Sequence, residues 1–353
     1  MRAYPADMRS RGPSTVLVLG VLAAACSSST VTGAPAPSPQ PSVSASPTPA
    51  ARPTAAPRAV PAVVVDPLTG TSPRRRGPVV VVKVDDVPLA RPYQRGLRQA
   101  AVVYQELVEG GATRLLAVLE SDAAGTTEVG PVRSVRESDL ELLRMYGRVA
   151  VGFSGGNAGV KATFAAAVRA GSVLDASYDS LPGAYRLAER RADARNFFTS
   201  AAALAAGRPG SGPRDIGLRF GRQPAGGVRT PVLHATYARQ DTVDVRWNAS
   251  TGTWVLSQGG TALPAAPRNV IVQVVRVTSS RYVDILGLGT PYTVSRGGGP
   301  AYVLRDGVRF PGRWVRSGYG ATRFLDRAGH DLLLHAGPTW VFLLPSGGAT
   351  SFG

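Results

Sequence analysis

The feature that most constrains the fold is an apolar run, Val79 to Val84, followed by two aspartates. Such a run is typical of a strand that is buried on both faces. Acidic residues at the carboxyl end of a central strand are a common position for catalysis or metal binding. However, Val87-Pro88 follows Asp85 and Asp86 directly, and an aspartate before a turn more often caps backbone amides. The run therefore predicts the central strand of an α/β-type domain with a mixed sheet.

A β-hairpin is predicted next, from Val102 to Leu119, because two apolar segments flank Gly110-Gly111. A two-residue turn would pair Glu109 with Ala112. With side chains alternating between faces, Glu109 and Arg114 would then be diagonal neighbours on one face.

A helix should begin shortly after this hairpin. The segments Ser134 to Glu137 and Ser138 to Glu141 both fit a capping box. Arg133 and Arg136 then lie in or beside the first turn, where backbone N–H groups and the helix dipole already favour an anion. Something negative should therefore lie nearby, either Glu109 in an internal salt bridge or a bound ligand.

A glycine-rich turn, Ser154 to Asn157, separates a strand at Val149 to Phe153 from a helix at Gly159 to Ala170. Its spacing fits neither of the two common nucleotide-binding glycine patterns, so a tight turn for close packing is favoured. The candidate ligand-binding residues are Arg114, Arg133, Ser134, Arg136, Asp85, Gly155 and Gly156, and Glu109 is the candidate catalytic residue. No cofactor is expected, and the histidine spacing in a chain with one cysteine makes a metal site unexpected.

Residues 1–26 have the pattern of a lipoprotein signal peptide: three arginines, a short apolar run and Cys26. Ser27-Ser28-Ser29 follow this single cysteine, which favours lipid attachment at Cys26 over ordinary secretion. Residues 27–61 are rich in Pro, Ala and Ser and are expected to be a disordered linker. These features predict a protein outside the cytoplasm, anchored to the bacterial cell membrane by a lipid.

The remaining residues divide by pattern into two predicted domains of an α+β protein. Residues 62–206 are expected to form the N-terminal α/β domain, and residues 207–229, rich in Gly, Pro and Arg, an interdomain linker. Residues 230–348 contain short strand patterns broken by glycine, which predict a smaller, mostly β C-terminal domain.

The net charge is +17, and the cations are almost all arginine because lysine occurs only at Lys83 and Lys161. The arginines are scattered and no aromatic residues interleave with them, so a nucleic-acid partner is not expected. For an exported protein the available anions are lipid headgroups and acidic wall polymers.

Several phrases of the chain resemble the YerB-like family of exported bacterial lipoproteins. They are KVDDVPLARPYQRGL, VVYQELVEGGATRLLAV, VGPVRSVRESDL and FSGG, with NVIVQVV and FLDRAGHDLLLHAGPTWVFLLP in the second domain. The resemblance covers nearly everything from Asp66 to Pro345 and implies two domains, but it carries no assigned chemistry. Two departures stand out: family members usually have an acid where this chain has Gln105, and an aspartate where it has Ala101.

Two functions are compatible with these observations. The first is a binding lipoprotein whose Arg-rich site takes an anionic envelope ligand, either a wall glycan or a polymer. The second is a peptidoglycan- or glycan-cleaving enzyme with Glu109 as general acid. The enzyme needs a raised pKa at Glu109, which nearby arginines would lower, so the binding function ranks first. Whether the protein is an enzyme stays open.

Overall fold

The computed structural model describes residues 65–72, 77–122, 128–190, 195–237, 241–284 and 287–353. The chain from Pro61 to Gly353 forms one compact unit. The predicted signal peptide, Cys26 and the linker of residues 27–61 lie outside the described residues. Within the described part, no helix combines the length and the apolar character needed to cross a membrane.

The described chain has few helices and many strands. Its α-helices are α1 (Glu137–Leu143), α2 (Ala158–Arg169) and α3 (Ala201–Ala205). The strands before residue 206 are β1 (Val79–Asp85), β2 (Val102–Leu107), β3 (Thr113–Glu120), β4 (Val129–Val132), β5 (Val149–Gly152), β6 (Val173–Asp175), β7 (Arg186–Arg190) and β8 (Arg195–Thr199). The later strands are β9 (Val228–Arg229), β10 (Val232–Thr236), β11 (Thr242–Asn248), β12 (Thr253–Gln258), β13 (Thr261–Ala262), β14 (Asn269–Val283), β15 (Gly289–Val294), β16 (Gly297–Arg305), β17 (Val308–Arg316), β18 (Arg323–Leu325), β19 (Thr339–Pro345) and β20 (Ala349–Phe352).

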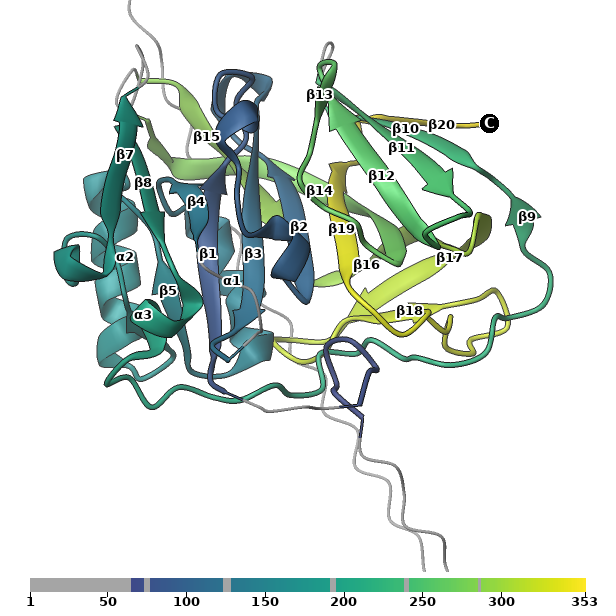
Figure 1. Cartoon of the computed structure of the whole chain (residues 1–353), viewed down its shortest axis with the longest axis horizontal. Helices are drawn as coiled ribbons and strands as arrows, with labels where there is room; N and C mark the ends of the chain where they lie inside the picture. The colour runs from purple at the N-terminus through teal and green to yellow at the C-terminus, as the bar shows by residue number, and fades with distance from the viewer. Residues whose placement is uncertain (1–64, 73–76, 123–127, 191–194, 238–240, 285–286) are drawn as a thin grey trace, which may run out of the picture. The chain divides into compact units, whose positions relative to one another are not determined.

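One 15-stranded mixed sheet runs through both regions of the described chain. Its main strand order is β18-β17-β16-β14-β19-β2-β3-β1-β4-β8-β7. The two regions join where β19 pairs in parallel with β2, in the middle of the molecule (Figure 1). A second, five-stranded antiparallel sheet has the order β13-β12-β11-β10-β20. The N-terminal region thus has a mixed sheet and the C-terminal region is built of strands, but the sequence did not predict that they share one sheet.

The apolar run in β1 is explained by its central position, since all seven of its residues are buried. Val81 packs in one apolar cluster with residues of α1 and α2. Val82 packs in another cluster with residues of β10, β11 and β12. Because side chains alternate along a strand, Lys83 and Asp85 lie on the side of the helices with Val81.

The predicted hairpin forms between β2 and β3, but its register differs by one residue from the prediction. Leu107 pairs with Thr113, whereas a two-residue turn would pair Glu109 with Ala112. The turn is longer because Glu109–Gly111 form a 3-10 turn, in which the two glycines have φ angles of 68° and 79°. Such angles favour glycine, which has no Cβ.

This difference in register determines which residues meet across the hairpin. Arg114 lies opposite Glu106 on the side of the helices, together with Asp85 of β1. The predicted contact between Glu109 and Arg114 is therefore wrong, because a shift of one residue moves every side chain of a strand to the other face.

Candidate functional site

A cavity of about 370 Å³ gathers most of the predicted site residues. Its walls come from the end of the hairpin turn, the start of β3, the segment between β4 and α1, the start of α2 and the β14–β15 hairpin. The predicted residues that line it are Glu109, Arg114, Arg133, Ser134, Arg136 and Gly156. Asp85 is fully buried beneath this wall, and Gly155 lies beside it against Ser134. The predicted residues thus come together, although their binding role stays a prediction.

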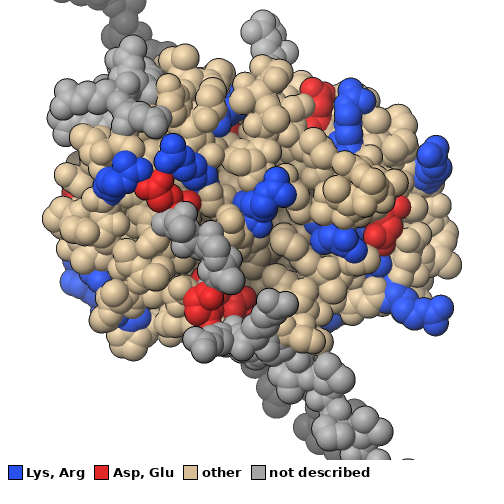
Figure 2. All heavy atoms as spheres, viewed as in Figure 1, with Lys and Arg blue, Asp and Glu red and all other residues tan. Residues whose placement is uncertain are grey.

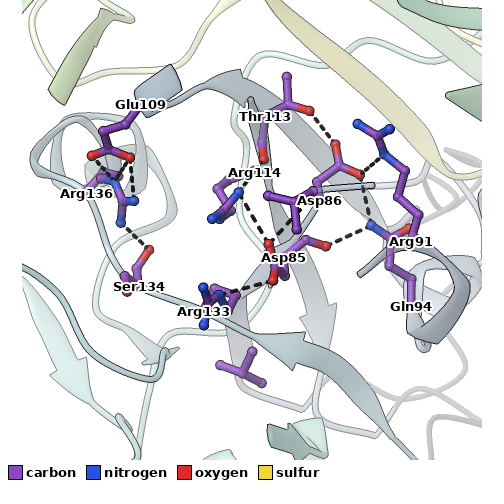
Figure 3. Close-up of polar contacts among 12 residues, drawn as sticks. Asp85, Asp86, Arg91, Gln94, Glu109, Thr113, Arg114, Arg133, Ser134 and Arg136 are labelled. Atoms are coloured by element: carbon purple, nitrogen blue, oxygen red, sulfur yellow. Dashed lines mark hydrogen bonds and ion pairs between the residues drawn. The ribbon is translucent and has the colours of Figure 1, made fainter. Parts of the chain in front are cut away.

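Arg114 and Arg133 both point at the carboxylate of Asp85 (Figure 3). Nη1 of Arg114 lies 3.3 Å from Oδ1 of Asp85, and Nε of Arg133 lies 3.1 Å from Oδ2. Arg114 is only 8% exposed, and its Nε atom is buried without a hydrogen-bond partner among the described residues. Asp85 therefore holds the two guanidinium groups side by side at the cavity wall.

The environment of Arg114 disfavours its positive charge. Burial lowers the pKa of Arg114, Asp85 acts in the opposite direction, and the charges of Arg136 and Arg133 lower the pKa further. A guanidinium group nevertheless stays protonated in proteins. Two cations that share a carboxylate leave positive charge for a further anion to neutralise.

Glu109 is held by Arg136, which realises the internal salt bridge considered above (Figure 3). Nε of Arg136 donates to Oε1 of Glu109 at 2.8 Å and Nη2 donates to Oε2 at 2.6 Å. Nη1 of Arg136 donates to the carbonyl oxygen of Ser134 at 3.1 Å. All three nitrogens of Arg136 are thus engaged within the protein, and its role in ligand binding stays a prediction.

The surroundings of Glu109 do not suit a general acid. Burial alone would raise its pKa, but the hydrogen bonds and the charge of Arg136, together with a hydrogen bond from Thr290, outweigh burial and lower the pKa. A general acid at neutral pH needs a pKa raised toward the working pH. The arrangement therefore favours an ionised Glu109 that fixes Arg136.

Helix α1 begins where the sequence indicates, but neither serine caps it. The residue before the helix is Arg136, whose backbone N–H donates to Oδ2 of Asp139 at 2.7 Å. The hydroxyl of Ser138 instead donates to the buried carboxylate of Glu106 at 3.2 Å. The prediction of serine capping is wrong because tertiary packing engages Ser138, and Ser134 lines the cavity.

Sequence reasoning missed a buried ionic cluster beneath the cavity. Lys83 contacts the carboxylate of Glu106 and lies 2.7 Å from Oδ1 of Asp139. The three side chains are only 1%, 2% and 1% exposed. The one available signal was the lysine within an otherwise apolar run. Asp139 joins this cluster to the site, since it also accepts the N–H of Arg136.

Gln105 and Asp86 belong to a separate polar network between the two sheets. Nε2 of Gln105 donates to Oδ2 of Asp86 at 2.8 Å and to Oε1 of Gln258 at 2.8 Å. Asp86 also accepts the hydroxyl of Thr113 at 2.6 Å. Burial raises the pKa of Asp86, although Arg91 opposes this shift. None of these five residues lines the cavity.

The C-terminal region completes the cavity through the β14–β15 hairpin. Asp284, Leu288 and Thr290 line one wall. Thr290 donates to Oε1 of Glu109 at 2.7 Å. Nδ2 of Asn157, at the start of α2, donates to the carbonyl oxygen of Val283 at 2.6 Å. The two sequence regions therefore share one site.

The described residues contain no group of three or more His, Cys, Asp or Glu side chains arranged to hold a metal ion. Nδ1 of His335 lies 3.0 Å from Oδ1 of Asp306, and its other ring nitrogen contacts Arg268. His330 instead contacts Asp326. The two neighbouring histidines thus belong to separate pairings.

The surface charge is dispersed over the face shown in Figure 2. Lysine and arginine side chains there lie singly or in small groups, some of them beside acidic residues. This distribution matches the scattered arginines of the sequence. A particular anion site therefore depends on local geometry rather than on one continuous basic patch.

Comparisons with known proteins identify related sequences for both regions. The model of the DUF3048 N-terminal domain, a protein of unknown function, matches residues 68–214, and the model of the DUF3048 C-terminal domain matches residues 233–341. A Bacillus subtilis protein with the name "Putative lipoprotein YerB" is 46% identical over 80 residues, which span 22% of this chain and 23% of that protein. The chain therefore aligns with about a quarter of the length of this curated relative.

A solved structure shows the same fold. The crystal structure of the YerB protein from Bacillus subtilis superposes with a TM-score of 0.66 and 20% sequence identity. The superposition covers 82% of this chain and 99% of that one. It supports an arrangement in which the regions matched by both family models form one structure.

Proposed function

Because the chain belongs to the DUF3048 family, whose function is unknown, we propose that it is an extracytoplasmic lipoprotein with an anion-binding cavity. A lipid on Cys26 anchors it to the cell membrane. The cavity binds an anionic ligand of the cell envelope, either a wall glycan or a polymer. Arg133 and Arg114 make the binding contacts, and Asp85 holds them in place.

The observation that carries this proposal is the sharing of Asp85 by Arg114 and Arg133 at a cavity wall. Arg133 is 31% exposed, so a ligand reaches it from solvent. The lipid anchor is supported by the signal-peptide pattern before Cys26 and by the word lipoprotein in the name of the Bacillus subtilis relative.

The test uses residues 62–353, nearly all of the compact unit from Pro61 to Gly353. This fragment is mixed with purified cell-wall sacculi, and the bound fraction is measured by sedimentation at increasing salt. We expect binding that weakens with salt, because ionic contacts are screened. Arg133→Ala should remove most of the binding. Arg169→Ala, which removes an exposed arginine at the far end of α2, should leave it unchanged.

Two results would contradict the proposal. If Arg133→Ala and Arg169→Ala bind equally well, the cavity is not the binding site. If the fragment instead releases soluble glycan from the sacculi and Glu109→Gln abolishes this release, the protein is an enzyme and the pKa argument against Glu109 as general acid fails.

A further inference from the structure

We infer that the cavity takes a phosphate ester of a sugar or polyol, rather than a ligand whose anionic group is a carboxylate. This inference rests on the proposed function, because it names the chemical class of ligand for the same site. It is carried by the unmatched charge, the remaining donors of Arg133 and the apolar part of the wall.

The positive charge is unmatched at one end of the cavity. Of the two acidic residues of the lining, Glu109 is held by Arg136. Asp284 belongs to the β14–β15 wall, and its hydrogen bond from the backbone N–H of Leu288 at 2.8 Å involves no cation. At the other end two guanidinium groups, Arg114 and Arg133, meet at Asp85. A ligand with at least one full negative charge at this end completes the pairing.

The donors at this end retain capacity for a ligand. Among the described residues Asp85 is the one ion-pair partner of Arg133, and it contacts Nε of this guanidinium group. Arg114 donates through Nη1 to the carbonyl oxygen of Thr113 at 2.9 Å, while its buried Nε has no partner. The terminal nitrogens of Arg133, whose side chain is 31% exposed, remain available to a ligand that enters the cavity.

The start of α2 also borders the cavity, and there the N–H of Gly159 already donates to Oδ1 of Asn157 at 2.7 Å. Gly156, Asn157 and Val160 line the cavity there, so the first turn of this 12-residue helix borders it. The dipole and the backbone N–H groups of a helix start favour phosphate. A planar carboxylate directs its two oxygens along one guanidinium edge, whereas the tetrahedral oxygens of a phosphate reach donors on more than one wall.

The remaining wall suits a carbon skeleton beside the phosphate. Val135, Val160 and Leu288 contribute apolar surface to the lining. At about 370 Å³ the cavity is at the small end of the range for ligand pockets. A single phosphate with one sugar or polyol unit matches this size, so a longer polymer would place one repeat in the cavity and the rest outside.

The test titrates residues 62–353 with glycerol phosphate, glucose phosphate and, as the carboxylate comparison, glucuronate, each at the same ionic strength. Isothermal calorimetry measures the dissociation constants. We expect the phosphate esters to bind at least about tenfold more tightly than glucuronate. Arg133→Ala should weaken phosphate-ester binding roughly ten- to hundredfold, as expected for the loss of charge-assisted hydrogen bonds.

Two further variants separate the effect of the planar guanidinium group from the effect of its charge. Arg133→Lys keeps the charge but loses the planar arrangement of N–H donors. It should therefore retain salt-dependent binding to sacculi and lose most of the preference for phosphate esters over glucuronate. Arg169→Ala should behave as the unchanged protein in both assays.

The source of the phosphate is distinguished by two larger probes, soluble poly(glycerol phosphate) and vesicles that contain phosphatidylglycerol. If the polymer binds and Arg133→Ala removes this binding, the phosphate comes from a wall polymer. If the vesicles bind and Arg133→Ala removes this binding, it comes from a lipid headgroup. Glucuronate binding as tight as that of the phosphate esters, with dependence on Arg133, would overturn this inference while the proposed function stands. If neither the small ligands nor sacculi bind, both fail.

Discussion

The buried cluster of Lys83, Glu106 and Asp139 makes the stability of this protein depend on pH in an unusual direction. Lys83 neutralises one carboxylate, so with both acids ionised the cluster would keep a buried negative charge. Burial raises the pKa of Glu106 to about 8; Lys83 opposes this shift and Asp139 adds to it. At neutral pH the folded protein therefore holds a proton on Glu106.

The sign of the effect follows from the proton count. In the unfolded chain Glu106 has a pKa of about 4.5, so between about pH 4.5 and about pH 8 the folded state binds a proton that the unfolded state has lost. Folding stability from this group is fully present below pH 4.5 and is lost as pH rises through 8. The slope approaches about 1.4 kcal/mol per pH unit, which amounts to ~2.5 kcal/mol between about pH 5.5 and about pH 7.5.

Glu106→Gln tests this reasoning because it keeps the shape of the side chain and removes its titration. The free energy of unfolding in urea is measured across this pH range by tryptophan fluorescence, since Trp254, Trp314 and Trp340 are fully buried. We expect stability to fall with pH more steeply in the unchanged protein than in the variant. Glu128→Gln is the control: its side chain is 27% exposed and its pKa is lowered, so it should follow the unchanged protein.

The decisive quantity is the difference in the free energy of unfolding between the unchanged protein and Glu106→Gln. A difference that stays constant within about 0.5 kcal/mol from about pH 5.5 to about pH 7.5 would show that Glu106 carries no extra proton in the folded state. The cluster would then contain two ionised carboxylates, and the argument from charge balance would be wrong.

Two other substitutions test buried polar groups. Lys83→Met leaves Glu106 and Asp139 without a cation and should lower the free energy of unfolding by about 3–5 kcal/mol near pH 7, measured in urea; a loss below ~1 kcal/mol would contradict the pairing. Gln105→Glu replaces the donor that lies 2.8 Å from Asp86 with a second carboxylate. It should lower stability by roughly 2–4 kcal/mol near pH 7 and by less near pH 4, and an equal loss at both pH values would refute the carboxylate contact.

Local signals in the sequence were sufficient to predict several helices and strands and to predict which residues lie together at the cavity. The apolar run predicted β1, and the glycine-rich turn predicted the strand and helix on either side of it. Arg133 and Arg136 were expected near an acid or a ligand because they flank a helix start. The structure pairs Arg136 with Glu109, and it places Arg133 at the same cavity with Asp85 behind it.

The contacts that the sequence did not reveal depend on distant residues. The β2–β3 turn is one residue longer than predicted, so Arg114 pairs with Asp85 and not with the predicted partner Glu109. The two glycines alone do not determine the length of this turn. The wall formed by Thr290 comes from the other region of the chain. The shared sheet, joined at β19 and β2, brings these regions together.

The position of Gln105 in the structure shows what is affected by having glutamine where family members usually have an acid. The resemblance implies an acid at this position in relatives, and the structure places Gln105 in the network between the two sheets rather than at the cavity. Its amide donates to Asp86 and its oxygen accepts the indole N–H of Trp340 at 3.2 Å. An acid there would meet a second buried carboxylate and could be accommodated only if one of the two held a proton. Glutamine in place of an acid therefore affects the polar network between the sheets, and the proposed binding by Arg133 does not depend on this residue.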